Sequence, residues 1–258
     1  MRWKFILGLL TICAVLMSMS YTMLIPFLPM YLIQDLGVVK ADVDMWSGAI
    51  FAITFLVSGI MAPIWGALAD KKSRKLMALR AGFCLAITYF LGGLVTNPWE
   101  LLGVRFIQGL SAGLWPALLA IISVESPKLK LGFCMGVMQG GMTAGGVLGP
   151  LFGGLLADQF GMRMAFFIAA AALFLITLAL LFFVKEEPRK PDPNAKPVKI
   201  WDFSLCRIPA VKRMLICAGV VQLTILMQQP IMPLYVAELQ GSMERIVLIS
   251  GIVFSVTG

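Results

Sequence analysis

The chain has 258 residues, of which 60% are hydrophobic and only 13% are charged, and its mean hydropathy is +0.92. Ordinary soluble domains carry roughly a quarter charged residues, so this composition excludes a soluble globular protein. Histidine is absent, which excludes imidazole metal sites and histidine-dependent hydrolytic triads and argues against an enzyme.

Long apolar stretches follow one another along the chain. A helix needs about 20 residues to cross about 30 Å of hydrocarbon. Seven stretches of this kind are predicted to span a membrane, at residues 5–32, 45–69, 76–96, 99–123, 131–157, 164–184 and 214–236. An eighth begins near residue 246 and stops at Gly258. The first stretch has a basic start, as signal peptides do, but its apolar run is too long and no small-residue cleavage site follows it.

The basic residues predict the orientation of these spans. With the N-terminus in the cytoplasm, most of the 21 Lys and Arg residues fall on the cytoplasmic side. Lys40, Arg163 and Arg245 fall outside, and Arg105 falls within a span. This asymmetry follows the positive-inside rule, and it explains the net charge of +8 without a nucleic-acid partner. We therefore predict a multi-pass protein of the plasma membrane.

A polar segment separates six predicted spans from the rest. Residues 185–213 contain five prolines and mixed charges and cannot continue a membrane helix. We interpret them as a cytoplasmic linker, although an ordinary long loop is the simpler alternative. The chain is then divided into a six-helix bundle at 1–184, the linker at 185–213, and the start of a second bundle at 214–258, with a seventh span and a truncated eighth.

A possible internal repeat supports two bundles. The pattern Pro26-x-x-Pro29-x-Tyr31 recurs as Pro230-x-x-Pro233-x-Tyr235, about 200 residues later. Two such units predict a complete protein of about 400 residues with twelve spans, a common plan for transporters. We expect the 258 residues to be a fragment of it.

The loop after the second predicted span reads GALADKKSRK over residues 66–75. Its small residues would let helix ends approach closely, although a plain basic cytoplasmic loop is the simpler interpretation. The segment resembles the signature G-x-L-a-D-r-x-G-R-r/k of the major facilitator superfamily, with Ser73 where that family usually has glycine. The resemblance implies a conformational latch formed by Gly66, Asp70, Arg74 and Lys75.

The fourth predicted span contains Arg105-x-x-Gln108-Gly109. An arginine at the centre of a span costs about 2.5–3.5 kcal/mol or more, so its side chain should face protein or a wet cavity. Snorkelling to the outer interface is the alternative, since Trp99 lies close by in the sequence. The motif resembles the R-x-x-q-G of proton-coupled facilitators, which implies a coupling role for all three residues. No carboxylate lies deep in the first six predicted spans, so we assign no proton carrier.

The fifth predicted span is rich in glycines at four-residue spacing. One set occupies positions 132, 136 and 140, and a second occupies 141, 145, 149 and 153. Each set lies along one helix face, where a neighbouring backbone can pack or slide. We expect partners from the second bundle, and Pro150 permits a bend. Gly149-Pro150-x-x-Gly153-Gly154 resembles the antiporter motif of the drug:proton branch, which implies a gating role for these residues and Gly145, although a purely structural interface is the simpler interpretation.

These motifs give an expected architecture and mechanism. The chain resembles bacterial twelve-span multidrug efflux proteins, which implies an all-α membrane protein with the major facilitator fold. Such proteins exchange external protons for cytoplasmic amphipathic drugs by rocking two bundles about a central site. The expected partners are the lipid bilayer, protons and small amphipathic substrates, with no nucleic acid and no cofactor beyond the proton gradient, and the complete protein is expected to be a monomer. A transporter of one specific metabolite and a non-transporting membrane receptor are the alternatives.

Soft and aromatic side chains suit a promiscuous binding surface. The candidates on the first, fourth, fifth and seventh predicted spans are Tyr21, Met23, Phe27, Met30, Trp115, Met138, Gln139, Met142, Met227 and Gln228. Taken singly, packing or lipid contact is the commoner role for each in so apolar a protein.

Overall fold

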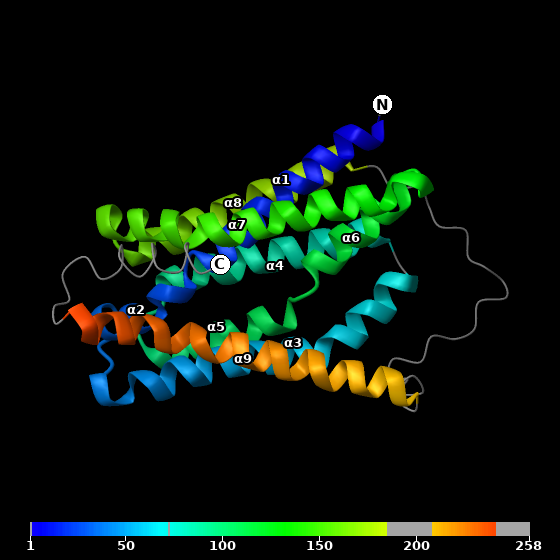
Figure 1. Cartoon of the computed structure of the whole chain (residues 1–258). Coiled ribbons are helices and arrows are strands. Elements are labelled where there is room, and N and C mark those ends of the chain that lie inside the picture. The colour runs from blue at the N-terminus through cyan, green and yellow to red at the C-terminus, as the bar shows by residue number, and fades with distance from the viewer. Residues whose placement is uncertain (1, 72, 185–207, 241–258) are drawn as a thin grey trace.

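The computed structural model describes residues 2–71, 73–184 and 208–240 (Figure 1). Within these residues the secondary structure is helical and contains no strand. The α-helices are α1 (Arg2–Thr22), α2 (Leu28–Gln34), α3 (Val43–Lys71), α4 (Arg74–Leu94), α5 (Pro98–Leu110), α6 (Leu114–Glu125), α7 (Leu131–Phe160), α8 (Met162–Phe183) and α9 (Pro209–Gln240). Short 3₁₀ turns occupy η1 (Ile25–Phe27), η2 (Lys40–Asp42) and η3 (Lys128–Lys130).

Six stretches of the described chain are long and apolar enough to cross a membrane. They correspond to the first six predicted spans and run roughly side by side in Figure 1. The expectation of an all-α, multi-pass membrane protein is therefore confirmed. The linker residues 185–207 and the predicted eighth span lie outside the described residues.

The first predicted span is not one helix. The sequence predicts a continuous helix over 5–32, but α1 ends at Thr22 and the chain re-forms as η1 and α2. Pro26 and Pro29 follow this end closely, and each lacks a backbone N–H and restricts the residue before it. The Tyr31 hydroxyl donates to Gly92 O of α4 at 3.0 Å, so α2 is anchored to a neighbouring helix.

The fourth predicted span is interrupted as well. A single helix over 99–123 was expected, whereas α5 ends at Leu110 and α6 begins at Leu114. Gly113 has φ +121°, a conformation that side-chain-bearing L-residues rarely adopt. The predicted span is confirmed at Pro98–Glu125, but hydropathy does not register the break that glycine permits within this apolar run.

Helix pairs, more than single helices, organise the bundle. The most extensive packing joins α1 to α7 and α4 to α8, followed by α3 to α5. Two apolar clusters form the interior. One contains Tyr31, Phe166 and Leu173, and the other contains Leu10 and Leu118. Segments far apart in sequence therefore come together in each cluster, and α9 contacts η1, α2 and α3.

Local capping sets the start of α5. The Asn97 Oδ1 accepts the Glu100 N–H at 2.9 Å, and Glu100 Oε2 accepts the Thr96 N–H at 2.8 Å. Pro98 stands at the first position of α5, where its missing N–H costs nothing. These reciprocal bonds satisfy free donors at the start of α5.

The end of the bundle predicted to face outside carries an ion pair that the sequence analysis missed. Arg163 Nε lies 3.2 Å from Asp35 Oδ1, and Arg163 Nη2 donates to Val95 O at 3.3 Å. One guanidinium thus joins the chain after α2, the end of α4 and the start of α8. We call Asp35, Val95 and Arg163 the outer clamp.

Removing the outer clamp should lower the stability of the fold only modestly. The Arg163 and Asp35 side chains are 41% and 26% exposed, so water screens the pair and its coupling should be at most about 1 kcal/mol. A double-mutant cycle with Arg163→Ala and Asp35→Ala, read as thermal unfolding in detergent, should give a small positive coupling that falls with added salt. Strictly additive single effects would show that the two side chains do not stabilise the fold together.

Candidate functional site

The guanidinium of Arg105 lies next to side chains of α5 and α8. Arg105 Nη1 donates to Gln108 Oε1 at 2.9 Å, one helical turn along α5. Its guanidinium carbon lies 5.9 Å from the ring centroid of Phe166 on α8. The Gln108 side chain is buried, with 4% exposed. The two polar groups of the motif therefore satisfy each other inside a largely apolar environment, as burial in hydrocarbon requires.

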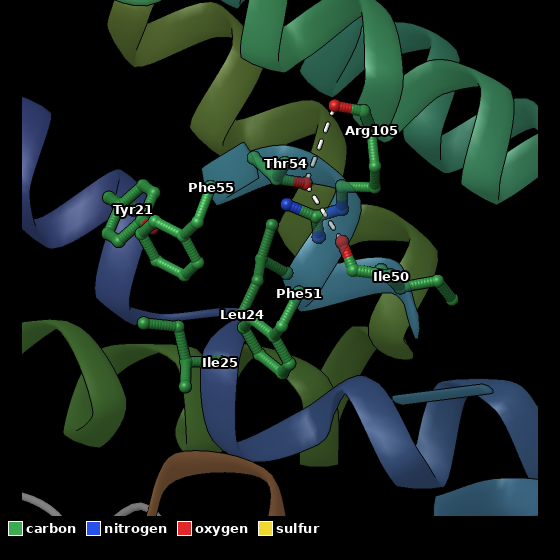
Figure 2. Close-up of a pocket in the computed structure, with 8 residues that line it drawn as sticks. All are labelled: Tyr21, Leu24, Ile25, Ile50, Phe51, Thr54, Phe55 and Arg105. Atoms are coloured by element: carbon green, nitrogen blue, oxygen red, sulfur yellow. Dashed lines mark hydrogen bonds between the residues drawn. The ribbon is translucent and has the colours of Figure 1, made fainter. Parts of the chain in front are cut away.

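A small pocket adjoins this pair between α1, η1, α3 and α5 (Figure 2). Its lining residues are Tyr21, Leu24, Ile25, Ile50, Phe51, Thr54, Phe55 and Arg105. The cavity volume is about 10 Å³, room for one water at most, whereas drug-sized sites measure about 300–1,000 Å³. The helices around Arg105 are therefore closed against a large ligand in this conformation.

Thr54 connects α3 to the Arg105 turn. Its hydroxyl lies 2.9 Å from Ile50 O and 3.4 Å from Arg105 O, as the dashed lines in Figure 2 show. Close approach of the two helices depends on Gly109, because a Cβ there would lie 2.8 Å from Thr54 O and from Val57 Cβ. The glycine of the motif thus sets the distance between α3 and α5.

The second glycine set of α7 lies against α1. A Cβ on Gly141 would lie 2.8 Å from Thr11 Cγ2, and one on Gly153 would lie 2.8 Å from Phe27. Cβ atoms on Gly145 and Gly149 would collide with Val15 O and the Thr22 hydroxyl. The expectation that this face takes its partners from the second bundle is therefore wrong, because α1 already covers it.

The first glycine set of α7 is arranged differently. A Cβ on Gly132, Gly136 or Gly140 would meet nothing within 4 Å among the described residues. Pro150 lies within α7, which continues from Leu131 to Phe160 without a break. The two sets therefore differ in their packing, although their spacing is the same.

Comparison with known proteins connects this arrangement to a family. The description "Major Facilitator Superfamily" belongs to a family model that matches residues 10–258. The chain belongs to the Major Facilitator Superfamily. It is a multi-pass membrane protein of a transporter family, and no comparison indicates catalysis.

Two similar curated proteins carry the same name. "Multidrug resistance protein MdtG" of Citrobacter koseri is 38% identical over 260 residues, and its Salmonella arizonae counterpart is 37% identical over 266. Both alignments cover 100% of this chain and 64% of the relative. The chain therefore spans about two thirds of the length of these relatives.

Solved facilitator structures agree in fold. The nucleoside transporter NupG matches with a TM-score of 0.80 and 17% identity, over 98% of this chain and 64% of that one. A bacterial homologue of the human lysosomal transporter Spinster matches with a TM-score of 0.63 and 24% identity, over 80% and 48%. At these identities the likeness shows the shared fold and nothing of the substrate.

The predicted latch of this facilitator lies where α3 ends and α4 begins. Gly66 is exposed on α3, and Lys75 Nζ donates to Leu181 O at 2.6 Å, near the C-terminal end of α8. The Ser73 hydroxyl accepts the Leu76 N–H at 3.0 Å. The serine that replaces the usual glycine therefore caps α4. Arg74 opens the same helix, and the Asp70 side chain is not described.

The structure distributes the predicted substrate residues over different environments. Met23, Phe27, Met30 and Met138 are at most 2% exposed and belong to the packed interior. Tyr21, Trp115 and Met142 are half-buried, and Gln139 is exposed. Met227 and Gln228 lie on α9, at positions whose side chains are not described. Among the members of this set whose side chains are described, Tyr21 alone lines the pocket beside Arg105. The buried members can meet a substrate only if the helices separate.

Sequence reasoning missed three polar side chains in the bundle. The Tyr89 ring is buried on α4, and its hydroxyl lies next to the Arg105 and Gln108 side chains. Trp65 Nε1 donates to Leu110 O at 2.9 Å, and Arg80 Nη2 donates to Ala112 O at 3.0 Å. Arg80 was counted only as a cytoplasmic basic residue, although its position inside an apolar stretch was a signal for a role within the membrane.

Proposed function

We propose that the complete protein carrying this chain exports amphipathic drugs from the cytoplasm in exchange for protons, by alternating access. The observation that carries the proposal is the Arg105–Gln108 pair, held at a small pocket between α1, α3 and α5. Similarity to multidrug resistance proteins over the whole chain supports drugs as the substrate class. Coupling to protons and plasma-membrane localisation are part of the same proposal.

Helix α9 begins the proposed second bundle and contacts the first bundle. Its contacts are with η1, α2 and α3, at the end of the bundle predicted to face outside. Nearly all residues from Ile208 to Thr224, on its other half, are exposed. In the complete protein the remaining helices of the proposed second bundle would cover these exposed residues.

The direct test is drug movement in membrane vesicles that contain the complete protein. An imposed proton gradient should drive accumulation of a fluorescent amphipathic dye into inside-out vesicles, and an uncoupler should abolish it. Proton release upon dye addition should accompany the uptake. Gradient-driven uptake of one small metabolite with no response to dyes would instead favour a specific transporter. Absence of any transport would favour the receptor alternative.

The predicted latch gives a separate test. Asp70→Asn should change the balance of inward-open and outward-open states more than it changes drug affinity, since the resemblance places Asp70 between moving bundles. Labelling of a cysteine at Ser123, exposed at the far end of α6, should report the change in a cysteine-free background. Asp44→Asn makes the same chemical change at an exposed position of the same helix and should have no effect. Equal labelling in both variants would contradict the latch.

A further inference from the structure

The interruption of the fourth span leaves backbone carbonyls without helical partners. The N–H of Ser111 donates to Ile107 O and Gln108 O, both at 3.1 Å, and these bonds close the last turn of α5. Leu110 O and Ala112 O belong to the interruption and accept from side chains of other helices. In hydrocarbon no water is present to satisfy such groups, so a broken helix persists only where protein supplies donors.

Two side chains supply these donors, and they also bind each other. Trp65 on α3 donates to Leu110 O at 2.9 Å, and Arg80 on α4 donates to Ala112 O at 3.0 Å. The Arg80 guanidinium carbon lies 3.3 Å from the centroid of the Trp65 ring, a cation–π contact. We call Trp65 and Arg80 the clasp. It joins α3 and α4 to the middle of the fourth span.

The clasp lies next to the coupling motif along the chain. Gln108 and Gly109 occupy the last turn of α5, directly before the carbonyls that the clasp binds, and Gln108 in turn accepts from Arg105. Gly113, on the other side of the break, has φ +121°. Straightening the span would return Gly113 to a helical φ and rotate the end of α5 relative to α3.

We propose that Trp65 and Arg80 are positioning residues. They stabilise the break between α5 and α6 in the fourth span and thereby set the orientation of the Arg105 and Gln108 side chains. They act through the backbone and not by contact with substrate. The proposal rests on the proposed function only for its transport readout, because the shape of the span can be measured without transport.

The shape of the fourth span is measured as the distance between spin labels at Gly103 on α5 and Val124 on α6. A Cβ on Gly103 would meet nothing within 4 Å, and Val124 is 63% exposed. A continuous helix would separate these positions by about 32 Å. Trp65→Phe keeps an aromatic ring and removes the N–H, so it should move the distance distribution toward that value, as should Arg80→Gln. Gly113→Ala should do the same by disfavouring the positive φ.

Matched controls make the same chemical changes away from the clasp. Trp99→Phe alters a tryptophan that is 70% exposed, and Arg213→Gln alters an exposed arginine at the start of α9. Neither should change the distance distribution. A distribution unchanged by both Trp65→Phe and Arg80→Gln would overturn the proposal.

The transport readout distinguishes positioning from stability and from substrate contact. In the complete protein Trp65→Phe should lower the maximal rate by roughly tenfold at an unchanged KM, the effect of one lost buried hydrogen bond. Its pH profile should shift in the same direction as that of Arg105→Lys, and Arg80→Lys should recover part of the rate lost in Arg80→Gln. Combining Trp65→Phe with Arg105→Lys should be less than additive. Full additivity, or a raised KM with an unchanged maximal rate, would overturn the positioning role. If the unaltered complete protein moves no drug, the proposed function fails, while the label distances still decide the clasp.

Discussion

Arg105→Ala should abolish gradient-driven drug export by the complete protein while folded protein remains in the membrane. The variant removes the cation that donates to Gln108 Oε1 at 2.9 Å and lines the pocket beside Tyr21. It also leaves the buried carbonyl of Gln108 without this donor, at a cost of about 1–3 kcal/mol. Arg105→Lys keeps the charge but loses the planar fork, so it should restore only part of the activity.

The measurement for Arg105 is uncoupler-sensitive dye transport in vesicles, normalised to the amount of folded protein. Arg213→Ala removes an exposed arginine of α9 and serves as the control, with transport at the unaltered level. Full drug export by Arg105→Ala would remove this arginine from the coupling mechanism. A variant that binds drug normally yet does not respond to the gradient would place the defect in coupling.

Gly145→Ala should destabilise the bundle, whereas Gly140→Ala should not. A Cβ on Gly145 would collide with Val15 O of α1, a backbone atom that cannot rotate away, and overpacking of this kind costs about 1–3 kcal/mol. A Cβ on Gly140 would meet nothing within 4 Å. Alanine there should even favour the helix, by up to about 1 kcal/mol.

The two alanine variants are compared by thermal unfolding of the 258-residue chain in detergent. The melting temperature should fall for Gly145→Ala and stay level or rise for Gly140→Ala. Gly149→Ala should behave like Gly145→Ala, since its Cβ would collide with the Thr22 hydroxyl and lie 2.8 Å from Met19 O. Equal melting temperatures for positions 140 and 145 would contradict the close packing of α1 on α7.

Membrane insertion and the positions of the spans could be read from the sequence. Both depend on properties local to a segment, because a helix satisfies its own backbone and about 20 apolar residues suffice to cross the bilayer. The glycine sets of α7 and the R-x-x-Q-G motif could also be recognised, since spacing along one helix decides which residues share a face. The six-span, all-helical arrangement follows from these local properties.

Other features depended on which helices meet. The two glycine sets of α7 have the same spacing, yet only the second is covered, by α1. Met23, Phe27 and Met30 were predicted to line a cavity, but they are buried in an apolar cluster with residues of other helices. Periodicity in the sequence shows which residues share one face of a helix, but it does not show which other helix packs against that face.

The interrupted fourth span shows the same limit most clearly. Gly113 permits the break, but the donors that stabilise it come from Trp65 and Arg80 on two other helices. The outer clamp likewise joins Asp35 to Arg163, 128 residues apart. By itself the sequence determined that this chain inserts as a set of membrane helices with a recognisable R-x-x-Q-G motif. Only the tertiary structure decided where those helices break and which side chains close the gaps, because a backbone group freed inside hydrocarbon must find its partner across space.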